Sequence, residues 1–330
     1  MTSVLLTGGG GAAIPWLIAH LRAKGHRVLA ADMNPYAVGL RMADVGFVIP
    51  PGNTPDFLPA LKRLCGDESV DVVVPLVDEE ILSTLELEMN GIHVLAPRKA
   101  FVEICLDKYQ LVQGLQAQGI VAPKTCLASA AWDNLEFPLV IKPRVGRGSR
   151  GFAVVKAADE LDKILRESPY ALNQLILQQF IAGEEFTVSV VVWRDGEVRA
   201  VVPKKVIVKK GITQLAVTRR HEGIIQLCHR IQDQLRADGP FNVQLRLDER
   251  TGEPLPFEIN PRFSTTVTLT TACGVDEVGG LIELSMGRNT SACGFWREGL
   301  MLMRHMQDVF MDEAQWAEYD LRDYSGSVVD

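Results

Sequence analysis

The N-terminal residues form a pattern of strand, glycine turn, helix and second strand. An apolar run covers residues 3–7, four glycines follow at 8–11, a helical stretch covers 14–24, and a second apolar run over 26–31 ends at Asp32. Two strands joined through a helix pair in parallel, so the pattern predicts a βαβ unit. Further strands at 70–76 and 93–97, with helices around 56–65 and 78–89, extend the prediction to an open parallel sheet over about the first hundred residues.

The pattern changes after about residue 120, where strands follow strands directly. A strand at 137–143 leads through the glycine-rich loop 146–151 into another strand, and an Asp-Gly turn at 195–196 joins two longer strands. A helix begins after Asp107, a preferred N-cap residue, and ends at Gly119. Two more strands, at 241–248 and 255–263, complete the series. This part of the chain is therefore predicted to be α+β, with mostly antiparallel strands.

Composition limits the partners and the compartment. The chain has 34 Lys and Arg against 41 Asp and Glu, a net charge of −7 without a dense basic tract, which argues against nucleic-acid binding. The six cysteines lack metal-ligand spacing, so neither a zinc site nor a disulfide framework is predicted. No apolar run approaches the roughly 20 residues of a membrane span, and the N-terminus lacks the basic start of a signal peptide. We expect a cytoplasmic protein with no membrane partner.

The last predicted hairpin carries a row of polar side chains. In the motif FEINPRF, which begins at Phe257, alternation places the apolar side chains on one face, where ordinary core is expected. The other face carries Glu258, Asn260 and Arg262, and Gln244 on the preceding strand would lie beside the first two. A carboxylate with two amide oxygens suits Mg²⁺, and Arg262 would follow about 7 Å along the row. A merely solvated face is the alternative.

Two lysines and the glycine-rich loop supply parts of a phosphate site. Lys142 ends a predicted strand just before Gly146–Gly151, whose glycines let backbone N–H groups approach phosphate oxygens. A plain turn is the alternative, and the P-loop pattern is excluded because no Gly-Lys-Ser/Thr follows. Lys108 lies in the first turn of its helix and, taken alone, is no different from a surface lysine.

An ordered set of motifs resembles one enzyme family. The set is DKYQ at 107–110, VIKP at 140–143, GRGSRG at 146–151, LQQFIAGEEFTV at 177–188, NVQLRLD at 242–248 and FEINPR at 257–262. It resembles the ATP-grasp enzymes, especially the ATP-grasp modules of the carbamoyl phosphate synthetase large subunit and stand-alone carboxylate-amine ligases. The resemblance implies an ATP-grasp fold with a Rossmann-like domain over 1–105, a lid region over 106–185 and a C-terminal domain with the metal site over 186–330.

The resemblance also implies roles for individual residues. ATP contacts are implied for Lys108, Lys142, Gly146, Gly148, Ser149, Gly151, Gln178, Gln179, Phe180, Ile181 and Glu185. The loop would close as a lid, the residues from Gln178 to Ile181 would meet adenine, and Glu185 would hold the ribose. Gln244, Glu258 and Asn260 would bind two Mg²⁺ ions, with Mn²⁺ as an alternative. Lys142 and Arg262 would be catalytic, with Arg262 stabilising an acyl phosphate. The family often has an acid where Gln179 stands.

The implied activity is that of an ATP-dependent carboxylate-amine ligase. It would form an amide or peptide bond through an acyl phosphate, release ADP and phosphate, and act on a small amino-acid-like substrate. One alternative is an NAD-dependent oxidoreductase, because the glycines 8–11 and Ala13 fit G-x-G-x-x-A and Asp32 ends the next strand. The other alternative is a catalytically silent nucleotide-binding protein.

The substrate contacts are the least defined part of the prediction. Asp78 and Glu79 follow a strand of the first domain, and Lys209 lies in the basic segment 203–211. An amine facing the acids and a carboxylate facing the lysine would suit an amino-acid ligase. The alternatives are a helix N-terminus stabilised by acidic side chains and a solvated strand edge. Small-molecule acid and amine partners are expected, and a homodimer is among the expected states.

Overall fold

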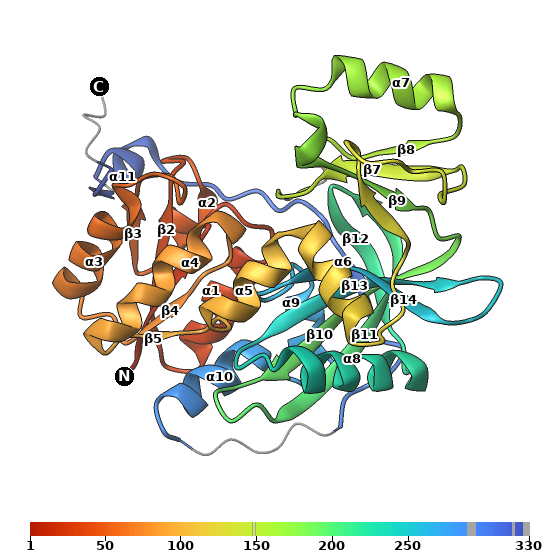
Figure 1. Ribbon diagram of the computed structural model, residues 1–330. Helices are drawn as coiled ribbons and strands as arrows, with labels where there is room; N and C mark the ends of the chain where they lie inside the picture. The colour runs from red at the N-terminus through yellow and green to blue at the C-terminus, as the bar shows by residue number, and fades with distance from the viewer. Residues whose placement is uncertain (147, 149, 289–294, 319–320, 326–330) are drawn as a thin grey trace. The chain divides into compact units, whose positions relative to one another are not determined.

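The computed structural model describes residues 1–146, 148, 150–288, 295–318 and 321–325 (Figure 1). The chain forms two compact units. The first comprises Met1–Lys99, Thr265–Trp296 and Met303–Asp330, and the second comprises Ala100–Ser264 and Arg297–Leu302. The predicted boundaries near residues 105 and 185 stay predictions. Among the described residues, no helix combines the length and the apolar character needed to span a membrane.

The first unit is built on a parallel sheet. Its strand order is β16-β3-β2-β1-β4-β5, and the neighbouring strands pair in parallel. The strands are β1 Ser3–Thr7, β2 Arg27–Asp32, β3 Val45–Val48, β4 Val72–Val74, β5 His93–Val94 and β16 Arg322–Asp323. The helices are α1 Ile14–Ala23, α2 Val38–Met42, α3 Phe57–Asp67, α4 Ile81–Thr84, α9 Val267–Ala272, α10 Glu277–Ser285 and α11 Glu313–Glu318. The predicted open parallel sheet is confirmed.

Two details of the first unit differ from the sequence prediction. The helix expected at about 78–89 consists of the 3-10 turns Asp78–Glu80 and Leu85–Asn90 on either side of the short helix α4. The C-terminal segment, for which no strand was predicted, adds strand β16 to strand β3. Tyr324 fixes this addition, because its N–H donates to Val48 O over 2.8 Å and its hydroxyl donates to Asp67 Oδ2 over 2.6 Å.

The second unit begins with two helices and contains two antiparallel sheets. The helices are α5 Lys99–Leu106, α6 Lys108–Ala117, α7 Ala158–Glu167 and α8 Glu222–Leu235. The smaller sheet has the order β6-β9-β7-β8, with β6 Thr125–Leu127, β9 Leu175–Gln179, β7 Leu139–Pro143 and β8 Ala153–Val155. The larger sheet has the order β14-β13-β10-β11-β12-β15, with β14 Pro254–Asn260, β13 Phe241–Asp248, β10 Gly183–Val192, β11 Val198–Lys210, β12 Ile212–Thr218 and β15 Met301–Met303. The predicted antiparallel α+β character is confirmed.

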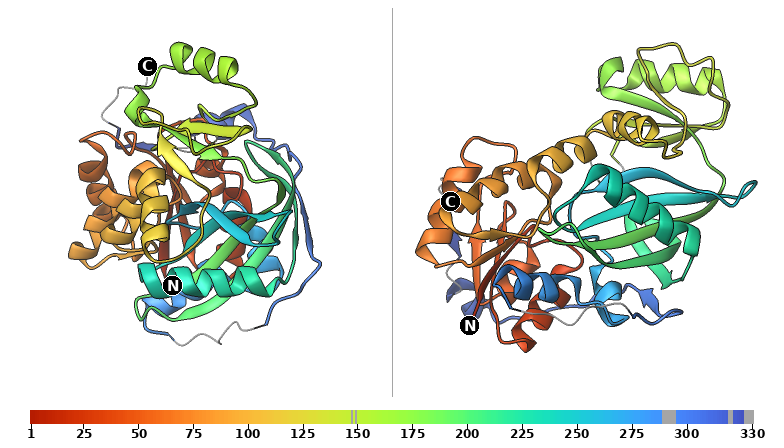
Figure 2. Two further views of the ribbon diagram at one scale, coloured as in Figure 1. Left: turned by 45° about the vertical axis from the view of Figure 1, so that its right-hand side comes forward. Right: turned by 60° about the horizontal axis from the view of Figure 1, so that its bottom comes forward.

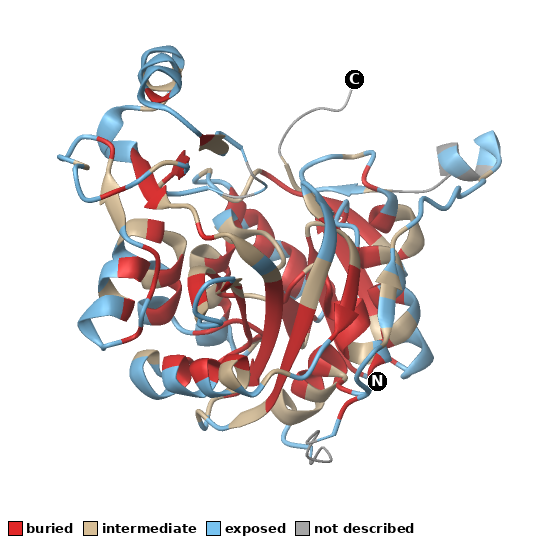
Figure 3. Cartoon of the chain, turned by 90° about the vertical axis from the view of Figure 1, so that its right-hand side faces the viewer, coloured by how far each residue is buried: buried red, intermediate tan, exposed pale blue. Residues whose placement is uncertain are grey.

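Each sheet of the second unit buries one face and leaves the other for polar groups. On β10, Phe186, Val188 and Val190 pack with residues of α6 and α8, and Figure 2 shows α8 lying along this sheet. The intervening residues Glu185 and Thr187 therefore point to the opposite face. The smaller sheet packs its own core residues, including Leu139, Ile141 and Leu177, around Leu161 of α7. Figure 3 shows buried residues concentrated in the central strands. The polar faces are consequently available for a site.

Candidate nucleotide-binding site

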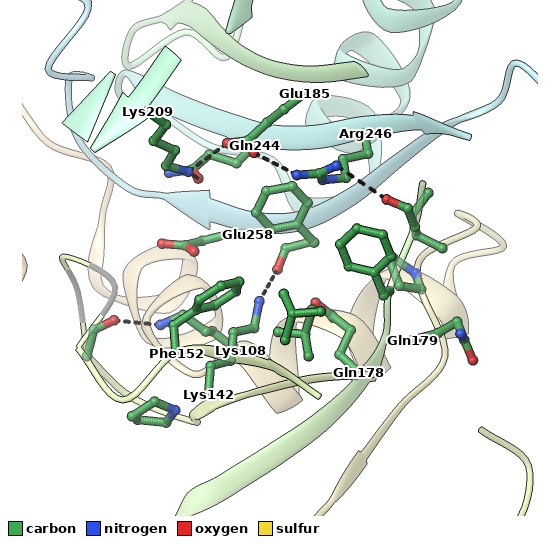
Figure 4. A pocket seen from close by; sticks show the side chains of 18 of the residues that line it. Lys108, Lys142, Phe152, Gln178, Gln179, Glu185, Lys209, Gln244, Arg246 and Glu258 are labelled. Atoms are coloured by element: carbon green, nitrogen blue, oxygen red, sulfur yellow. Dashed lines mark hydrogen bonds and ion pairs between the residues drawn. The ribbon is translucent and has the colours of Figure 1, made fainter. Parts of the chain in front are cut away.

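A pocket of about 400 Å³ lies within the second unit (Figure 4). This volume falls within the roughly 300–1,000 Å³ of typical small-molecule sites. Among the described residues that line it are five cationic side chains and two acidic ones, a local excess of positive charge in a chain whose net charge is −7. The cations are Lys108, Lys142, Arg150, Lys209 and Arg246, and the acids are Glu185 and Glu258. An anionic ligand is therefore favoured here.

The smaller sheet provides an apolar wall of the pocket. Gln178 of β9 pairs with Val140 of β7, and Val140 pairs with Val154 of β8, so these three side chains share one face. All three line the pocket. Lys142 lies two residues beyond Val140 on the same face, about 7 Å along the strand. The wall is thus apolar around Val140 and cationic at the end of β7.

Lys108 is the first residue of helix α6, and its neighbour Asp107 is the N-cap of that helix. The Asp107 carboxylate caps α6 by accepting from the backbone N–H groups of Tyr109 and Gln110, over 3.0 and 3.2 Å. Arg144 Nε also donates to both oxygens of this carboxylate over 2.8 Å. Burial raises the pKa of Asp107, but the hydrogen bonds from Arg144 and from the backbone outweigh it, so the pKa lies below 3.8. Lys108 Nζ donates to Gly146 O over 2.6 Å, which connects the helix to the glycine loop.

Lys142 is a buried cation. It is 6% exposed, and its Nζ donates to Phe257 O over 3.3 Å and lies 5.2 Å from the centre of the Phe257 ring. Burial lowers its pKa from 10.5 to about 8; Glu258 opposes this decrease, and the cations Lys108 and Lys209 add to it. Holding a lysine in this state costs free energy, which an incoming anion would offset.

The larger sheet presents the acidic groups. Gln244 of β13 and Glu258 of β14 are directly paired across the two strands, so their side chains lie on one face as predicted. One strand further, Glu185 forms ion pairs with Lys209 over 2.6 Å and with Arg246 over 3.2 Å. Lys209 Nζ also donates to Gln244 Oε1 over 3.3 Å. Lys209, predicted to contact the substrate, therefore lies in the same pocket as the predicted ATP residues.

A β-bulge corrects the predicted alternation of the FEINPRF motif. Gln244 pairs with Glu258, but Leu245 pairs with Pro256, so Phe257 is the extra residue. The bulge turns Phe257 out of the core, where we expected it, and into the pocket wall. The strand also ends at Asn260 rather than at residue 263. Arg262 therefore does not continue the row at 7 Å; it lies in a bend, and its Nη1 donates to Phe263 O over 3.1 Å.

The oxygen groups of the larger sheet fit a magnesium ion. Glu258 and Gln244 offer a carboxylate and an amide oxygen side by side, and Asn260 follows Glu258 by two residues on the same strand. Hard oxygen donors of this kind suit Mg²⁺. Asn260 is buried and is not among the pocket-lining residues. Within the described residues, no group of three His, Cys, Asp or Glu side chains could hold a metal, so any ion here depends on the amide oxygens.

Most of the predicted ATP contacts come together in this pocket. Its lining includes Lys108, Lys142, Gly146, Gly148, Gln178, Gln179, Phe180, Ile181 and Glu185. Gly151 has a φ of 67° and is not among the lining residues, and Ser149 lies outside the described residues. Asp78 and Glu79 belong to a 3-10 turn of the first unit. The proposed contacts of all these residues with ATP, metal or substrate stay predictions.

The sequence reasoning missed several residues of the wall. Val140 and Val154 could have been found by counting two residues back from Lys142 and across to the next strand. Phe257 could not, because its position depends on the bulge. Arg246 was not predicted, yet it lines the pocket and its guanidinium lies 5.3 Å from the centre of the Phe180 ring.

The N-terminal glycine turn in the first unit has its own hydrogen-bond partners. Asp32 accepts from the backbone N–H of Gly10 and of Asn34, each over 2.8 Å. The carboxylate expected to hold an NAD ribose thus bonds to the turn itself. The dinucleotide interpretation stays a prediction, for which NADH fluorescence is the test.

A cationic pocket with an apolar wall and a paired carboxylate and amide has the composition expected of a nucleotide site. Residues 171–308 match the family described as "ATP-grasp in the biosynthetic pathway with Ter operon", and residues 4–94 match "PylC-like, N-terminal domain". A carbamoyl-phosphate synthase of Methanobrevibacter smithii is 24% identical over 292 residues, covering 82% of this chain and 77% of that protein. The chain spans only 25% of the carbamoyl phosphate synthase large chain of Xylella fastidiosa, with 23% identity over 285 residues, 76% of this chain.

Solved structures agree with these matches at the level of the fold. The biotin carboxylase domain of Hydrogenobacter thermophilus 2-oxoglutarate carboxylase, a dimer in complex with MgADP, ADP and bicarbonate, has a TM-score of 0.71 at 17% identity, covering 88% of this chain and 71% of that one. An L-amino acid ligase from Bacillus licheniformis has a TM-score of 0.68 at 18% identity, covering 87% and 74%. Residues 171–308 therefore match an ATP-grasp domain, and the predicted ATP-grasp resemblance, fold class and enzyme class are confirmed.

Proposed function

We propose that this protein is an ATP-dependent carboxylate-amine ligase that acts on a small amino-acid-like acid through an acyl phosphate. The observation that carries the proposal is the single pocket in which Lys108 and Lys142 lie opposite the paired Gln244 and Glu258. The pocket therefore offers cations for a triphosphate and oxygen ligands for its metal. Similarity to a carbamoyl-phosphate synthase and to an L-amino acid ligase supports the choice of reaction.

The reaction needs positioning and charge stabilisation rather than a protein nucleophile. A carboxylate oxygen of the acid attacks the γ-phosphorus of ATP, the bond to the β–γ bridging oxygen breaks, and ADP leaves. The amine nitrogen then attacks the acyl carbon, phosphate leaves, and the amine loses a proton. Lys108 and Lys142 would hold phosphate oxygens and stabilise the charge that develops during transfer. Arg262 stays a predicted contact of the acyl phosphate.

Magnesium binding is proposed for Glu258, Gln244 and Asn260, with two ions expected and Mn²⁺ as an alternative. When bound, the metal would neutralise phosphate oxygens and orient the γ-phosphate for displacement. Glu258 is the sole carboxylate of this set, so it would supply the ligand charge, while the amides complete the coordination.

Phosphate release tests the reaction directly. The purified protein would be incubated with Mg·ATP and pairs of amino acids and small acids, with phosphate, ADP and AMP measured and products identified by mass. Substrate-dependent ADP and phosphate release with a condensed product is expected. AMP release would indicate an adenylate and contradict the acyl phosphate, whereas binding of ATP without turnover in the presence of any acid would leave only a catalytically silent nucleotide-binding protein.

The variant Glu258→Gln tests the metal assignment. Removal of the one carboxylate ligand is expected to lower Mg²⁺-dependent ADP release by at least about a hundredfold, as for other groups that stabilise transition-state charge. Glu253→Gln is the matched control, since Glu253 is an exposed acid in the turn of the same hairpin. Normal turnover of Glu258→Gln would show that the metal is held elsewhere.

Compartment and assembly follow as further proposals. The composition supports a cytoplasmic enzyme of small molecules, and the biotin carboxylase relative is described as a dimer. Size-exclusion chromatography with light scattering would distinguish a monomer from a homodimer.

A further inference from the structure

Gln178 is a largely buried side chain whose amide oxygen has no hydrogen-bond partner among the residues that the structure describes. The side chain is 3% exposed, lines the pocket and belongs to the apolar wall (Figure 4). Its Nε2 donates to Thr125 Oγ1 over 2.9 Å, while Oε1 has no hydrogen-bond partner among the described residues. This oxygen is not one of the fully buried unpartnered atoms of the described residues, so it is open to the pocket, where it can accept a hydrogen bond from a donor on a ligand.

Thr125 determines which end of this amide can face the pocket. The Thr125 hydroxyl donates to Pro123 O over 2.8 Å, and a carbonyl oxygen can only accept. Because its one proton is used there, Thr125 Oγ1 can only accept from Gln178. The nearer amide atom must then be the donor Nε2, which leaves the acceptor Oε1 for the ligand. Rotating the amide by half a turn would break one hydrogen bond of this relay.

The base of a nucleotide belongs at this end of the pocket. Gln178 pairs with Val140, and Val154 and Phe180 also line this part of the wall, whereas Lys142 lies about 7 Å further along β7. The triphosphate must meet the lysines, and the flat, mostly apolar base then takes the apolar wall. Gln178 is the buried polar side chain of that wall.

The neighbouring Gln179 is engaged elsewhere. Its Oε1 accepts from Glu136 N over 3.0 Å and its Nε2 donates to Glu136 O over 2.8 Å. Both ends of this amide are thus bonded to the backbone before β7, and Figure 4 shows the side chain directed away from Gln178. Gln179 was predicted to lie against adenine, but both ends of its side-chain amide are hydrogen-bonded to the Glu136 backbone. Gln178 is therefore the side-chain amide that can hydrogen-bond to the base.

We propose that Thr125 is a positioning residue that sets nucleotide specificity by holding Gln178 as an acceptor. The proposal rests on the ATP site described above and defines how its base end discriminates. A 6-amino purine presents an N–H donor to Gln178 Oε1, whereas a 6-oxo purine presents an acceptor. Two acceptors facing each other in a buried site lose a hydrogen bond on both sides, so hypoxanthine and guanine are disfavoured.

Binding of Mg·ADP and Mg·IDP to the full chain, by calorimetry, tests the proposal without knowledge of the acid or amine. The two nucleotides differ at the 6-position of the base and in the proton on N1. The unchanged protein should prefer ADP by about 10- to 100-fold, the range expected for one unpaired buried acceptor. Thr125→Val removes the hydroxyl at nearly constant shape, so the amide can turn its Nε2 to the 6-oxo group. The ADP/IDP affinity ratio should fall by about tenfold, and Thr125→Ser should restore it.

A second background separates specificity from folding. In Gln178→Glu both terminal oxygens accept, so orientation no longer matters, and adding Thr125→Val should leave the ADP/IDP ratio unchanged. A structural defect caused by Thr125→Val would instead lower the binding of both nucleotides in either background. An unaltered ratio in Thr125→Val alone, or equal affinity of the unchanged protein for both nucleotides, refutes this inference. Binding of neither nucleotide to the unchanged protein refutes the proposed function itself.

Discussion

Replacement of Lys142 by methionine should stabilise the free protein while weakening nucleotide binding. Lys142 is buried at the end of β7, and its pKa is lowered from 10.5 to about 8, chiefly by burial. Below pH 8 the lysine is charged in both the folded and the unfolded chain, and the folded state bears the cost of burying that charge. Between pH 8 and 10.5 only the folded chain has lost the proton. Stability therefore rises with pH across this interval, because the unfolded state binds more protons.

The pKa change gives the size of the effect. A decrease from 10.5 to about 8 corresponds to about 3 kcal/mol of unfolding free energy at pH 7. Methionine fills a similar volume without a charge, but it gives up the hydrogen bond to Phe257 O, worth about 1–2 kcal/mol. A net gain of about 1–2 kcal/mol is expected, which raises the melting temperature by about 2–8 °C for a unit of this size.

Unfolding by urea at pH 7 and at pH 9.5 would measure this gain. Lys142→Met should be more stable than the unchanged protein at pH 7, and the difference should shrink at pH 9.5. Lys163→Met, at an exposed lysine of α7, is the matched control and should change little at either pH. Calorimetry should show Mg·ADP binding weakened at least tenfold in Lys142→Met only. A variant less stable than the unchanged protein at pH 7, or a difference independent of pH, would refute a charged, buried Lys142.

Two further substitutions test how the pocket is held. Asp107→Ala removes both the cap of α6 and the partner of Arg144, so it should cost about 2–3 kcal/mol in urea unfolding and weaken Mg·ADP binding, with exposed Asp162→Ala unaffected. The pKa of Asp107 is lowered in the folded chain, so the stabilisation by its carboxylate is fully present above the unfolded-state pKa of 3.8 and is lost as the pH falls through the folded-state pKa. If the unfolding free energy of Asp107→Ala depended on pH in this acid range just as that of the unchanged protein does, this assignment would be contradicted. Gly183→Ala would place a Cβ 1.8 Å from Leu247 O at a φ of 135°, so several kcal/mol of destabilisation are expected by thermal unfolding. Gly252→Ala, which meets no atom within 4 Å, should cost only about 1 kcal/mol, and equal effects would refute the clash.

Regular periodicity made much of the second unit predictable. The two-residue period of strands placed Glu258 beside Gln244, and the register confirms that pairing. Asp107 was predicted as an N-cap from residue type alone, and its carboxylate accepts from two backbone N–H groups of α6. Both inferences used only local rules that tertiary structure did not override.

Irregular backbone limited the prediction at other places. The polar row is shifted by the bulge at Phe257 and by the end of β14 at Asn260. Nothing in the local sequence FEINPRF predicts the bulge or the strand end. On β11 the register shifts twice between Val206 and Lys209, so counting cannot tell which lysine of that segment faces the pocket. The pairing of β16 with β3 depends on contacts of only two strand residues, too few for any periodicity.

The two faces of each sheet also separate stability from specificity in this unit. Leu177 and Ile259 lie in the hydrophobic cores, whereas their neighbours Gln178 and Glu258 face the pocket. Changes at the core positions act through cavities and cost stability. Changes at the pocket positions leave the core intact, so substitutions such as Gln178→Glu and Glu258→Gln can alter ligand chemistry on an unchanged fold. Lys142 is the exception, because it is both buried and in the pocket, and there stability and binding must oppose each other.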